Sequence, residues 1–226
     1  MTPVDLVIAP DPERAAAAAT GILVECARHG GHVALAGGST PRHAYELAAA
    51  AEPDWSRVEL WLGDERCVPL DDERSNLRLV RETLLARLDR QPTVHPVRTE
   101  LGAVDAAAAY DEALRGVVLD LAFLGLGDDG HTASLFPGSP ALAETERRVV
   151  AAEAGLAPWV ERVTMTIPML ASARRVVFLV TGAAKAEAAP RAFGDVPSAE
   201  TPASLVRSAR GETLAILDHE AAVNLA

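Results

Sequence analysis

The chain has 226 residues, of which 49% are hydrophobic and 4% aromatic. This apolar fraction excludes disorder as the main state, and a chain of this length can bury roughly 70% of its unfolded surface. The net charge of -11 argues against a nucleic-acid partner, because affinity for phosphate backbones comes from basic surfaces. No apolar run reaches the roughly 18 residues that predict a membrane span, and no signal-like pattern is visible, so no membrane partner is expected.

Short apolar runs alternate with helices rich in Ala, Leu and Arg along the chain. The predicted strands cover residues 5–9, 32–36, 58–62, 118–124, 162–167, 176–181 and 213–217, and the predicted helices cover residues 12–28, 41–51, 75–88 and 105–115, with another after residue 185. This alternation predicts an α/β fold with a mostly parallel sheet and helices on both faces. No repeat or long linker divides the chain, so one α/β domain over residues 1–226 is expected.

Four turns that carry glycine and polar residues follow predicted strands. They lie at residues 37–40, 63–66, 125–131 and 182–185. Ligands of α/β sheets bind beyond the carboxyl ends of the strands. If these strands are parallel neighbours, the four turns converge on one edge of the sheet and form a single site.

The first turn, Gly37-Gly38-Ser39-Thr40, opens a helix directly after a strand. Glycines let backbone N–H groups approach an anion, and the N-terminus of a helix carries a partial positive charge. These features favour a phosphate site. An ordinary helix start with Ser39 or Thr40 as the N-cap is compatible with the same residues. A Walker A loop is excluded, because no Gly-Lys pair precedes the hydroxyl residue.

The third turn matches the G-x-G-x-x-G pattern of dinucleotide sites at residues 125–130. Asp128 and Asp129 would repel a pyrophosphate, and Pro137 prevents a long helix from following, so a nicotinamide site is not expected. His131 follows this turn and is a candidate general base, because a neighbouring carboxylate can orient its ring. A histidine that only hydrogen-bonds its own loop fits the local sequence equally well.

Further candidates are charged or reactive groups near the other turns. Asp64 and Arg66 follow a predicted strand, where a solvated loop is the alternative to a site. Lys185, the one lysine among 21 basic residues, could close on an anion or be an ordinary surface lysine. Cys26 and Cys67 are predicted to be reduced thiols, and the spacing of His, Cys, Asp and Glu indicates no metal site.

Taken together, these blocks resemble the 6-phosphogluconolactonase family over nearly the whole chain. The matching blocks are AGGSTP at residues 36–41, GDERCVP at 63–69 together with Ser75 and Asn76, GLGDDGHTASLFP at 125–137, RVTMT at 162–166 and VTGAAKA at 180–186. The family shares its fold with glucosamine-6-phosphate deaminases and ribose-5-phosphate isomerases. The resemblance therefore implies a Rossmann-like sheet and a cytoplasmic enzyme of the oxidative pentose phosphate pathway that needs no metal or organic cofactor.

The resemblance further implies hydrolysis of 6-phospho-D-glucono-1,5-lactone to 6-phospho-D-gluconate, so the partner is a small sugar-phosphate lactone. We interpret His131 as the base that deprotonates water, with Asp129 or Asp64 orienting its ring. Arg66 or loop N–H groups would stabilise the oxyanion of the tetrahedral intermediate. The quaternary structure is expected to be a monomer or a small homo-oligomer.

The phosphate group of this substrate is expected at the first turn, with two basic side chains supplying charge. The predicted phosphate-binding residues are Gly37, Gly38, Ser39, Thr40, Arg162 and Lys185.

Two alternatives remain open. A glucosamine-6-phosphate deaminase-like aldose–ketose enzyme would share the Gly-Gly-Ser-Thr-Pro-like and Asp-Gly-His blocks. Deaminases, however, typically carry Tyr in place of Arg66 and an Ile-Ala-Phe-Asn-Glu-Pro type of run at residues 132–137, whose Glu is used for ring-opening deamination. A non-catalytic sugar-phosphate sensor on the same fold is the other alternative, and the presence of His131, Arg66 and Asp64 argues against it.

Overall fold

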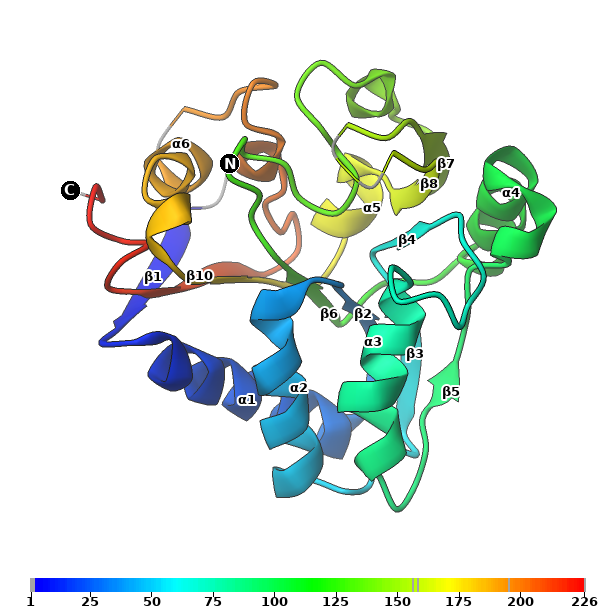
Figure 1. Ribbon diagram of the computed structural model, residues 1–226, viewed down its shortest axis with the longest axis horizontal. Helices are drawn as coiled ribbons and strands as arrows, with labels where there is room; N and C mark the ends of the chain where they lie inside the picture. The colour runs from blue at the N-terminus through cyan, green and yellow to red at the C-terminus, as the bar shows by residue number, and fades with distance from the viewer. Residues whose placement is uncertain (1–2, 156, 158, 195, 226) are drawn as a thin grey trace.

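Seven parallel strands form the central sheet of the computed structural model, which describes residues 3–155, 157, 159–194 and 196–225 (Figure 1). From one edge to the other the order is β1 (Val4–Ala9), β10 (Glu212–Asp218), β9 (Arg175–Val180), β6 (Leu121–Leu124), β2 (Gly31–Leu35), β3 (Val58–Leu62) and β5 (Thr93–Val94). Each pair of neighbours is parallel. The predicted mostly parallel α/β sheet is confirmed.

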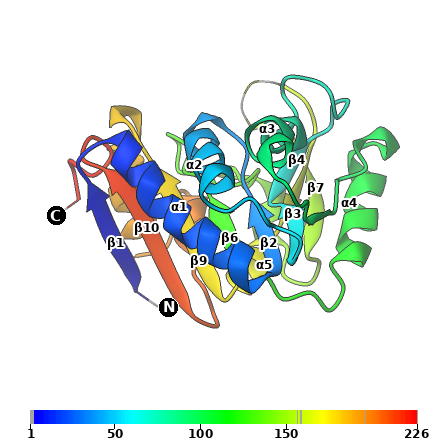
Figure 2. The same cartoon turned by 90° about the horizontal axis from the view of Figure 1, so that it is seen from below.

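Helices cover both faces of this sheet. The helices α1 (Pro12–His29), α2 (Ser39–Ala51) and α3 (Asn76–Thr83) pack on one face, which Figure 2 shows from below. The helices α4 (Ala103–Ala113), α5 (Ile167–Ala171) and α6 (Ala188–Phe193) pack on the other. Short 3-10 turns connect them: η1 (Leu85–Arg87), η2 (Thr99–Leu101), η3 (Pro140–Ala143), η4 (Ala183–Lys185) and η5 (Pro202–Leu205).

Alternate side chains of the central strands enter two separate hydrophobic cores. On β6, Leu121 and Phe123 pack with α1, α2 and α3, whereas Ala122 and Leu124 pack with the helices of the opposite face. Successive residues of a strand point to opposite faces, so a strand covered on both sides must be apolar throughout. This requirement explains the nearly continuous apolar run that predicted β6.

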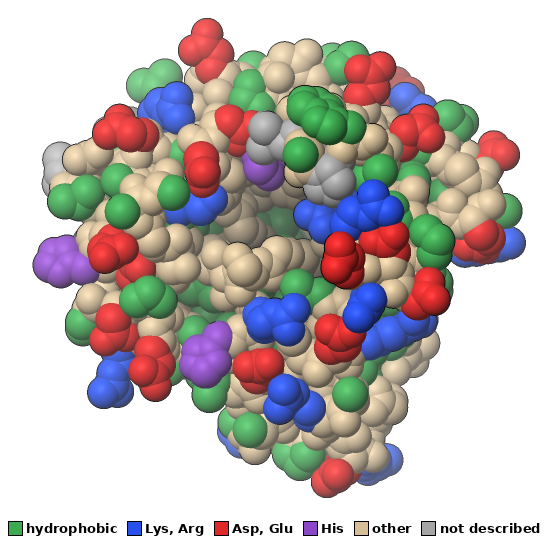
Figure 3. All heavy atoms as spheres, in the orientation of Figure 1, with side chains coloured by type: hydrophobic (Ala, Val, Ile, Leu, Met, Phe, Trp, Pro, Cys, Tyr) green, Lys and Arg blue, Asp and Glu red, His purple; other side chains and the backbone are tan. Residues whose placement is uncertain are grey.

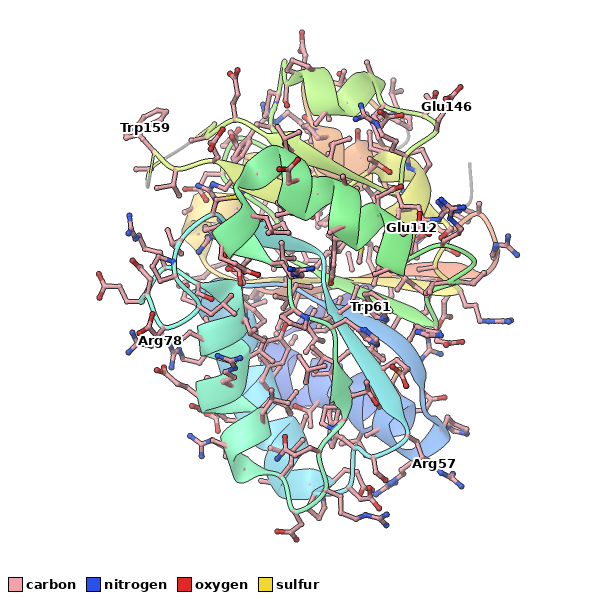
Figure 4. All side chains as sticks on the ribbon, turned by 90° about the vertical axis from the view of Figure 1, so that its right-hand side faces the viewer. Arg57, Trp61, Arg78, Glu112, Glu146 and Trp159 are labelled. Carbon is pink, nitrogen blue, oxygen red and sulfur yellow. The ribbon has the colours of Figure 1, made fainter. Side chains whose placement is uncertain are left out.

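A second, antiparallel sheet lies above one end of the central sheet. It contains β4 (Asp64–Arg66), β8 (Arg162–Met165) and β7 (Val149–Ala152), in that order. The helix α4 packs against it, and Trp61 of β3 lies in the interior between α4 and the central sheet (Figure 4). The sequence indicated a strand at residues 162–167, but it did not indicate this separate sheet, and residues 64–66 were expected to be a turn.

The chain leaves the adjacent strands β2 and β6 in opposite directions. After β2 the chain forms α2 on one face of the sheet and continues to β3 and β5. After β6 it packs Leu126 and Leu135 into the hydrophobic core on the other face and continues to β9 and β10. Such a reversal opens a crevice at the carboxyl ends of the two strands. The strands β9, β6, β2 and β3 are consecutive in the sheet, so the turns that follow them meet at this crevice.

Two predicted helices differ from the structure. The helix expected over residues 75–88 ends at Thr83 and is followed by η1. The helix expected after residue 185 is preceded by η4, which ends at Lys185, and α6 itself begins three residues later. In the part of the chain that the structure describes, no helix is long and apolar enough to cross a bilayer.

Candidate active site

A cavity of about 210 Å³ opens at the carboxyl ends of β2, β3, β6 and β9. Figure 3 shows a hollow near the centre of the molecule, with a histidine on its wall and basic side chains near its rim. The predicted site residues that line the cavity are Gly37, Gly38, Ser39, Thr40, Asp64, Arg66, His131, Arg162 and Lys185. Of the predicted residues, Asp129 alone is absent from this lining, and it contacts the ring of His131.

His131 is held by Asp129 through two contacts to one oxygen. The backbone N–H of His131 donates to Asp129 Oδ1 at 3.0 Å, and the ring atom Nδ1 lies 2.5 Å from the same oxygen. Burial acts to raise the pKa of Asp129, but the hydrogen bonds from His131 and its charge act in the opposite direction and are stronger together. The pKa of this carboxyl is therefore lower than its usual value. In the neutral imidazole, a carboxylate oxygen at Nδ1 selects the tautomer in which Nδ1 is the donor and Nε2 is the acceptor.

The turn before His131 explains why this geometry forms. The N–H of Gly130 donates to the carbonyl of Gly127 at 3.0 Å, which places Asp128 and Asp129 at the two central positions of a tight turn. A Cβ on Gly127 would lie 2.0 Å from His131 Nδ1 and 2.6 Å from Asp129 Oδ1. Residue 127 must therefore be glycine for the histidine and the carboxylate to meet.

The segment after His131 is fixed by side-chain hydrogen bonds on either side of a left-handed residue. Ala133 has a φ of 50°, which is uncommon for a residue with a Cβ, and it lines the cavity. Thr132 donates from Oγ1 to the carbonyl of Gly125 at 2.8 Å, and the buried Ser134 donates from Oγ to Asp64 Oδ2 at 2.6 Å. The backbone of this loop is therefore held at both ends.

Asp64 does not orient His131. Its Oδ2 accepts from Ser134, and its Oδ1 accepts from Nδ2 of Asn76 at 3.1 Å. Both neighbours are buried, and Asp64 is itself buried at the cavity wall. The two carboxylates that the sequence left as alternatives thus have different partners, and Asp129 is the one bonded to the ring.

Arg66 and Arg162 lie opposite each other on β4 and β8, and both line the cavity. Burial, and then the positive charge of Arg66, lower the pKa of Arg162. Arg66 donates from one terminal nitrogen to the carbonyl of Arg74 at 2.7 Å, and its buried Nε has no acceptor among the described atoms. Two neighbouring cations at the wall of a cavity favour an anionic ligand.

Glu65, between Asp64 and Arg66, joins β4 to the start of α3. It is fully buried and accepts the N–H groups of Arg66, Asn76 and Leu77 at 2.7 to 2.9 Å. Burial raises its pKa, and these N–H groups act in the opposite direction. The Glu65 carboxylate accepts hydrogen bonds both from the first N–H groups of α3 and from the backbone of Arg66. It therefore fixes Arg66 and Asn76 at the cavity.

The glycine-rich turn presents the N-terminus of α2 to the cavity. The N-cap is Gly38, with a φ of 97°, and no side chain caps the helix. The alternative in which Ser39 or Thr40 is the N-cap is therefore wrong, since the helix already begins at Ser39. The first N–H groups of a helix lack intrahelical acceptors, so an N-terminus without a side-chain cap suits an anion.

Lys185 reaches the cavity from η4 and forms an ion pair with Asp128. The pair connects the turn after β9 with the turn after β6. Lys185, predicted to bind the phosphate, therefore does line the cavity, and its ammonium group is paired with a carboxylate of the same chain.

Several residues of the site were not among the predicted ones, and Asn76, Gly127 and Ser134 are the most informative of them. Asn76 and Gly127 line the cavity, and Ser134 holds Asp64. All three belong to the sequence blocks that carry the resemblance. The roles of Asn76 and Ser134 depend on their hydrogen bonds to Asp64 in another segment, which a sequence pattern does not specify, and the role of Gly127 depends on how closely its own turn brings His131 to it. Among the described residues, no group of three or more His, Cys, Asp or Glu side chains could hold a metal ion.

Comparisons with known proteins show the family to which this chain is similar. The model of the family described as glucosamine-6-phosphate isomerases/6-phosphogluconolactonase matches residues 10–215. A 6-phosphogluconolactonase of Synechocystis sp. is 37% identical over 207 residues, which cover 86% of this chain and 85% of that protein.

Solved structures give the same result. The structure of 6-phosphogluconolactonase from Trypanosoma cruzi has a TM-score of 0.88 at 30% identity and covers 98% of this chain and 97% of that one. A monomeric glucosamine-6-phosphate deaminase, at 18% identity, has a TM-score of 0.80 over 98% of this chain and all of its own, which shows a shared fold. The chain therefore belongs to the glucosamine-6-phosphate isomerase/6-phosphogluconolactonase family.

Proposed function

We infer that the chain hydrolyses 6-phospho-D-glucono-1,5-lactone to 6-phospho-D-gluconate, the step of the oxidative pentose phosphate pathway that opens the lactone. The relatives that share 37% and 30% of its residues carry this activity in their names. The observation that carries the mechanism is the His131–Asp129 pair at the wall of a cavity rich in basic groups.

In this mechanism His131 activates the water that attacks C1 of the lactone. Nε2 takes a proton from the water as the new C1–O bond forms, and Asp129 stabilises the resulting imidazolium. The carbonyl electrons move onto the carbonyl oxygen and return when the bond between C1 and the ring oxygen breaks. The ring oxygen then receives the proton from Nε2, so the reaction consumes one water and leaves the enzyme unchanged.

The negative charge of the tetrahedral intermediate needs a donor near C1. Arg66 suits this role, because its guanidinium is at the cavity wall and its backbone and one terminal nitrogen are already fixed by Glu65 and Arg74. Asp64, held by Ser134 and Asn76, lies at the cavity wall, where its carboxyl oxygens are suited to accept a hydrogen bond from a hydroxyl group of the sugar.

The phosphate group is placed at the N-terminus of α2, with Arg162 and Lys185 supplying charge. The first N–H groups of α2 and the hydroxyl groups of Ser39 and Thr40 are donors there, and both cations line the same cavity. These contacts lie away from C1, so they are expected to bind lactone, intermediate and product about equally.

The cavity does not favour deamination. Among the described residues of the lining, Asp64 is the one carboxylate, and the segment after His131 places Phe136 4.6 Å from the imidazole ring. A non-catalytic sensor is disfavoured by the complete His131–Asp129 pair. The mutual placement of base, cations and helix N-terminus supports hydrolysis of a phosphorylated lactone.

Replacement of His131 tests the mechanism. His131→Ala is expected to lower kcat by roughly 10²- to 10⁴-fold, the usual contribution of a general base. The measurement is release of 6-phosphogluconate, coupled to its oxidation and corrected for spontaneous opening of the lactone. His29→Ala, at an exposed position at the end of α1, is the matched control and should retain wild-type kcat. Wild-type kcat in His131→Ala would remove His131 from the mechanism.

A further inference from the structure

Lys185 has a counter-ion within the chain at the position proposed for the phosphate. Its Nζ pairs with Oδ1 of Asp128. The lysine side chain is 21% exposed and lines the cavity, whereas the Asp128 side chain is 66% exposed and lies outside the lining. A carboxylate at the rim thus neutralises a cation that faces the interior of the site.

Asp128 and Asp129 occupy the same turn but contact different partners. They are its two central residues, since the N–H of Gly130 closes the turn on the carbonyl of Gly127. The carboxylate of Asp129 contacts the ring of His131, whereas the carboxylate of Asp128 pairs with Lys185 at the end of η4. The turn therefore carries one carboxylate for the base and another for the cation.

The backbone at Lys185 is fixed, so an exchange of partners needs only side-chain rotation. The N–H of Lys185 donates to the carbonyl of Gly182 at 3.0 Å. The N–H of Gly182 in turn donates to both carboxylate oxygens of the fully buried Asp218, each at 3.0 Å. An ammonium on a four-carbon stem can turn from one anion to another without moving this anchor.

We propose that Asp128 is an internal competitor for the phosphate-binding cation and weakens the binding of substrate and product alike. The proposal rests on the proposed function, which places the phosphate at Lys185. A phosphate that approaches Lys185 must displace Asp128 or share the ammonium with it, and in either case the two anions repel each other. The phosphate does not react, so the same opposition acts on the lactone, the intermediate and the product.

Asp128→Asn tests this proposal, because it removes the charge and keeps the shape. We expect KM for the phosphorylated lactone and the inhibition constant of 6-phosphogluconate to fall by the same factor, about two- to fivefold, as is usual for an exposed ion pair. The neighbouring Asp129→Asn should instead lower kcat, because it disturbs the base. An unchanged or increased KM in Asp128→Asn would overturn the proposal, since the carboxylate would then be neutral or helpful to binding.

A double-mutant cycle with Lys185→Met separates the pair from a general effect of charge. Lys185→Met alone should raise KM, and adding Asp128→Asn should then change it no further. A fall of KM in that background as large as in the wild type would mean that Asp128 acts on the whole cavity, and the pairing would be rejected. Loss of the proposed function has a different signature, since the wild type would then fail to hydrolyse the lactone.

Discussion

Two glycines of the site are required because a polar side chain occupies the place of a Cβ. At Gly37 the added atom would lie 1.9 Å from Oδ1 of Asn76, and at Gly127 it would lie 2.0 Å from Nδ1 of His131. Both distances are far below van der Waals contact, and both neighbours are held by other hydrogen bonds. The glycines therefore allow the close approach of site side chains, in addition to the backbone freedom that glycine usually provides.

Gly127→Ala should separate His131 from Asp129 without touching either side chain. We expect kcat to fall by roughly the 10²- to 10⁴-fold that a general base contributes, because the new methyl group displaces the ring. Gly21→Ala, in α1 and outside the cavity lining, is the control for the loss of a glycine and should retain wild-type kcat, since its added Cβ would have no heavy atom within 4 Å. Full activity in Gly127→Ala would show that the observed contact between ring and carboxylate is dispensable.

The sequence predicted the members of the site better than their pairings. Glycine-rich and charged turns after strands identified His131, Arg66 and Lys185, because short turns after parallel strands meet at one end of a sheet. The choice between Asp64 and Asp129 depended on Ser134, whose hydroxyl holds Asp64 across a long stretch of chain. Hydrogen bonds between segments so distant have no periodic pattern, so the sequence could not decide between the two carboxylates.

At the scale of the element, α1 shows how local sequence determines where a helix begins and how stable it is. Asp11 caps the helix by accepting the N–H of Arg14 at 2.8 Å, and a proline lies in the first turn. Gly21 is exposed in its interior, with no heavy atom within 4 Å of an added Cβ. The same helix therefore contains a stabilising cap and a destabilising glycine.

Two substitutions in α1 should change stability in opposite directions. Gly21→Ala should increase the free energy of unfolding by about 0.5–1 kcal/mol, because alanine restricts the unfolded chain and fits the helix. Asp11→Ala should decrease it by about 1 kcal/mol, through loss of the cap. Urea unfolding measures both values. A loss of stability in Gly21→Ala would contradict the open surroundings of that position.

Three apolar strands were predicted closely, whereas β6, predicted over residues 118–124, begins only at Leu121, and the shortest strands were not predicted. The predicted bounds of β2, β3 and β9 differ from the observed ones by one residue at most, since each is an apolar run buried on both faces. The strands β4 and β5 have three and two residues, too few to establish an alternating pattern. β4 contains Asp64, Glu65 and Arg66, and their buried hydrogen bonds replace the apolar contacts expected of a strand.

At the scale of the whole molecule, a net charge of -11 contrasts with an anionic substrate. The basic groups at the cavity, Arg66, Arg162 and Lys185, reverse this sign locally. Interactions between exposed charges weaken beyond a Debye length of about 8 Å at physiological salt, so the nearby cations outweigh the distant carboxylates once the substrate enters. The total charge of a protein is therefore a poor guide to the charge of its ligand when the site is a cavity.

Binding of product should stabilise the whole fold by mass action. At about 100 times its dissociation constant, 6-phosphogluconate should add about 2.7 kcal/mol to the free energy of unfolding. For a chain of this size the expected rise in Tm is roughly 5–10 °C. His131→Ala should retain most of this rise, because the ring acts on water, whereas Lys185→Met should show a smaller one. Equal shifts in Lys185→Met and the wild type would contradict the placement of the phosphate.

The strand order also determines when the sheet can be completed during synthesis. β1 pairs with β10 in the described sheet, and β10 separates it from β9. Although β1 leaves the ribosome first, it has no strand to join until β10 follows, and its residues Leu6, Val7 and Ile8 are apolar. Until then the backbone N–H and C=O groups of β1 have no partner strand, which makes the segment prone to association with other unfolded chains. In the folded chain Leu6, Val7 and Ile8 are still 41%, 41% and 54% exposed, so pairing with β10 satisfies the backbone of β1 along one edge and leaves these apolar side chains at the surface.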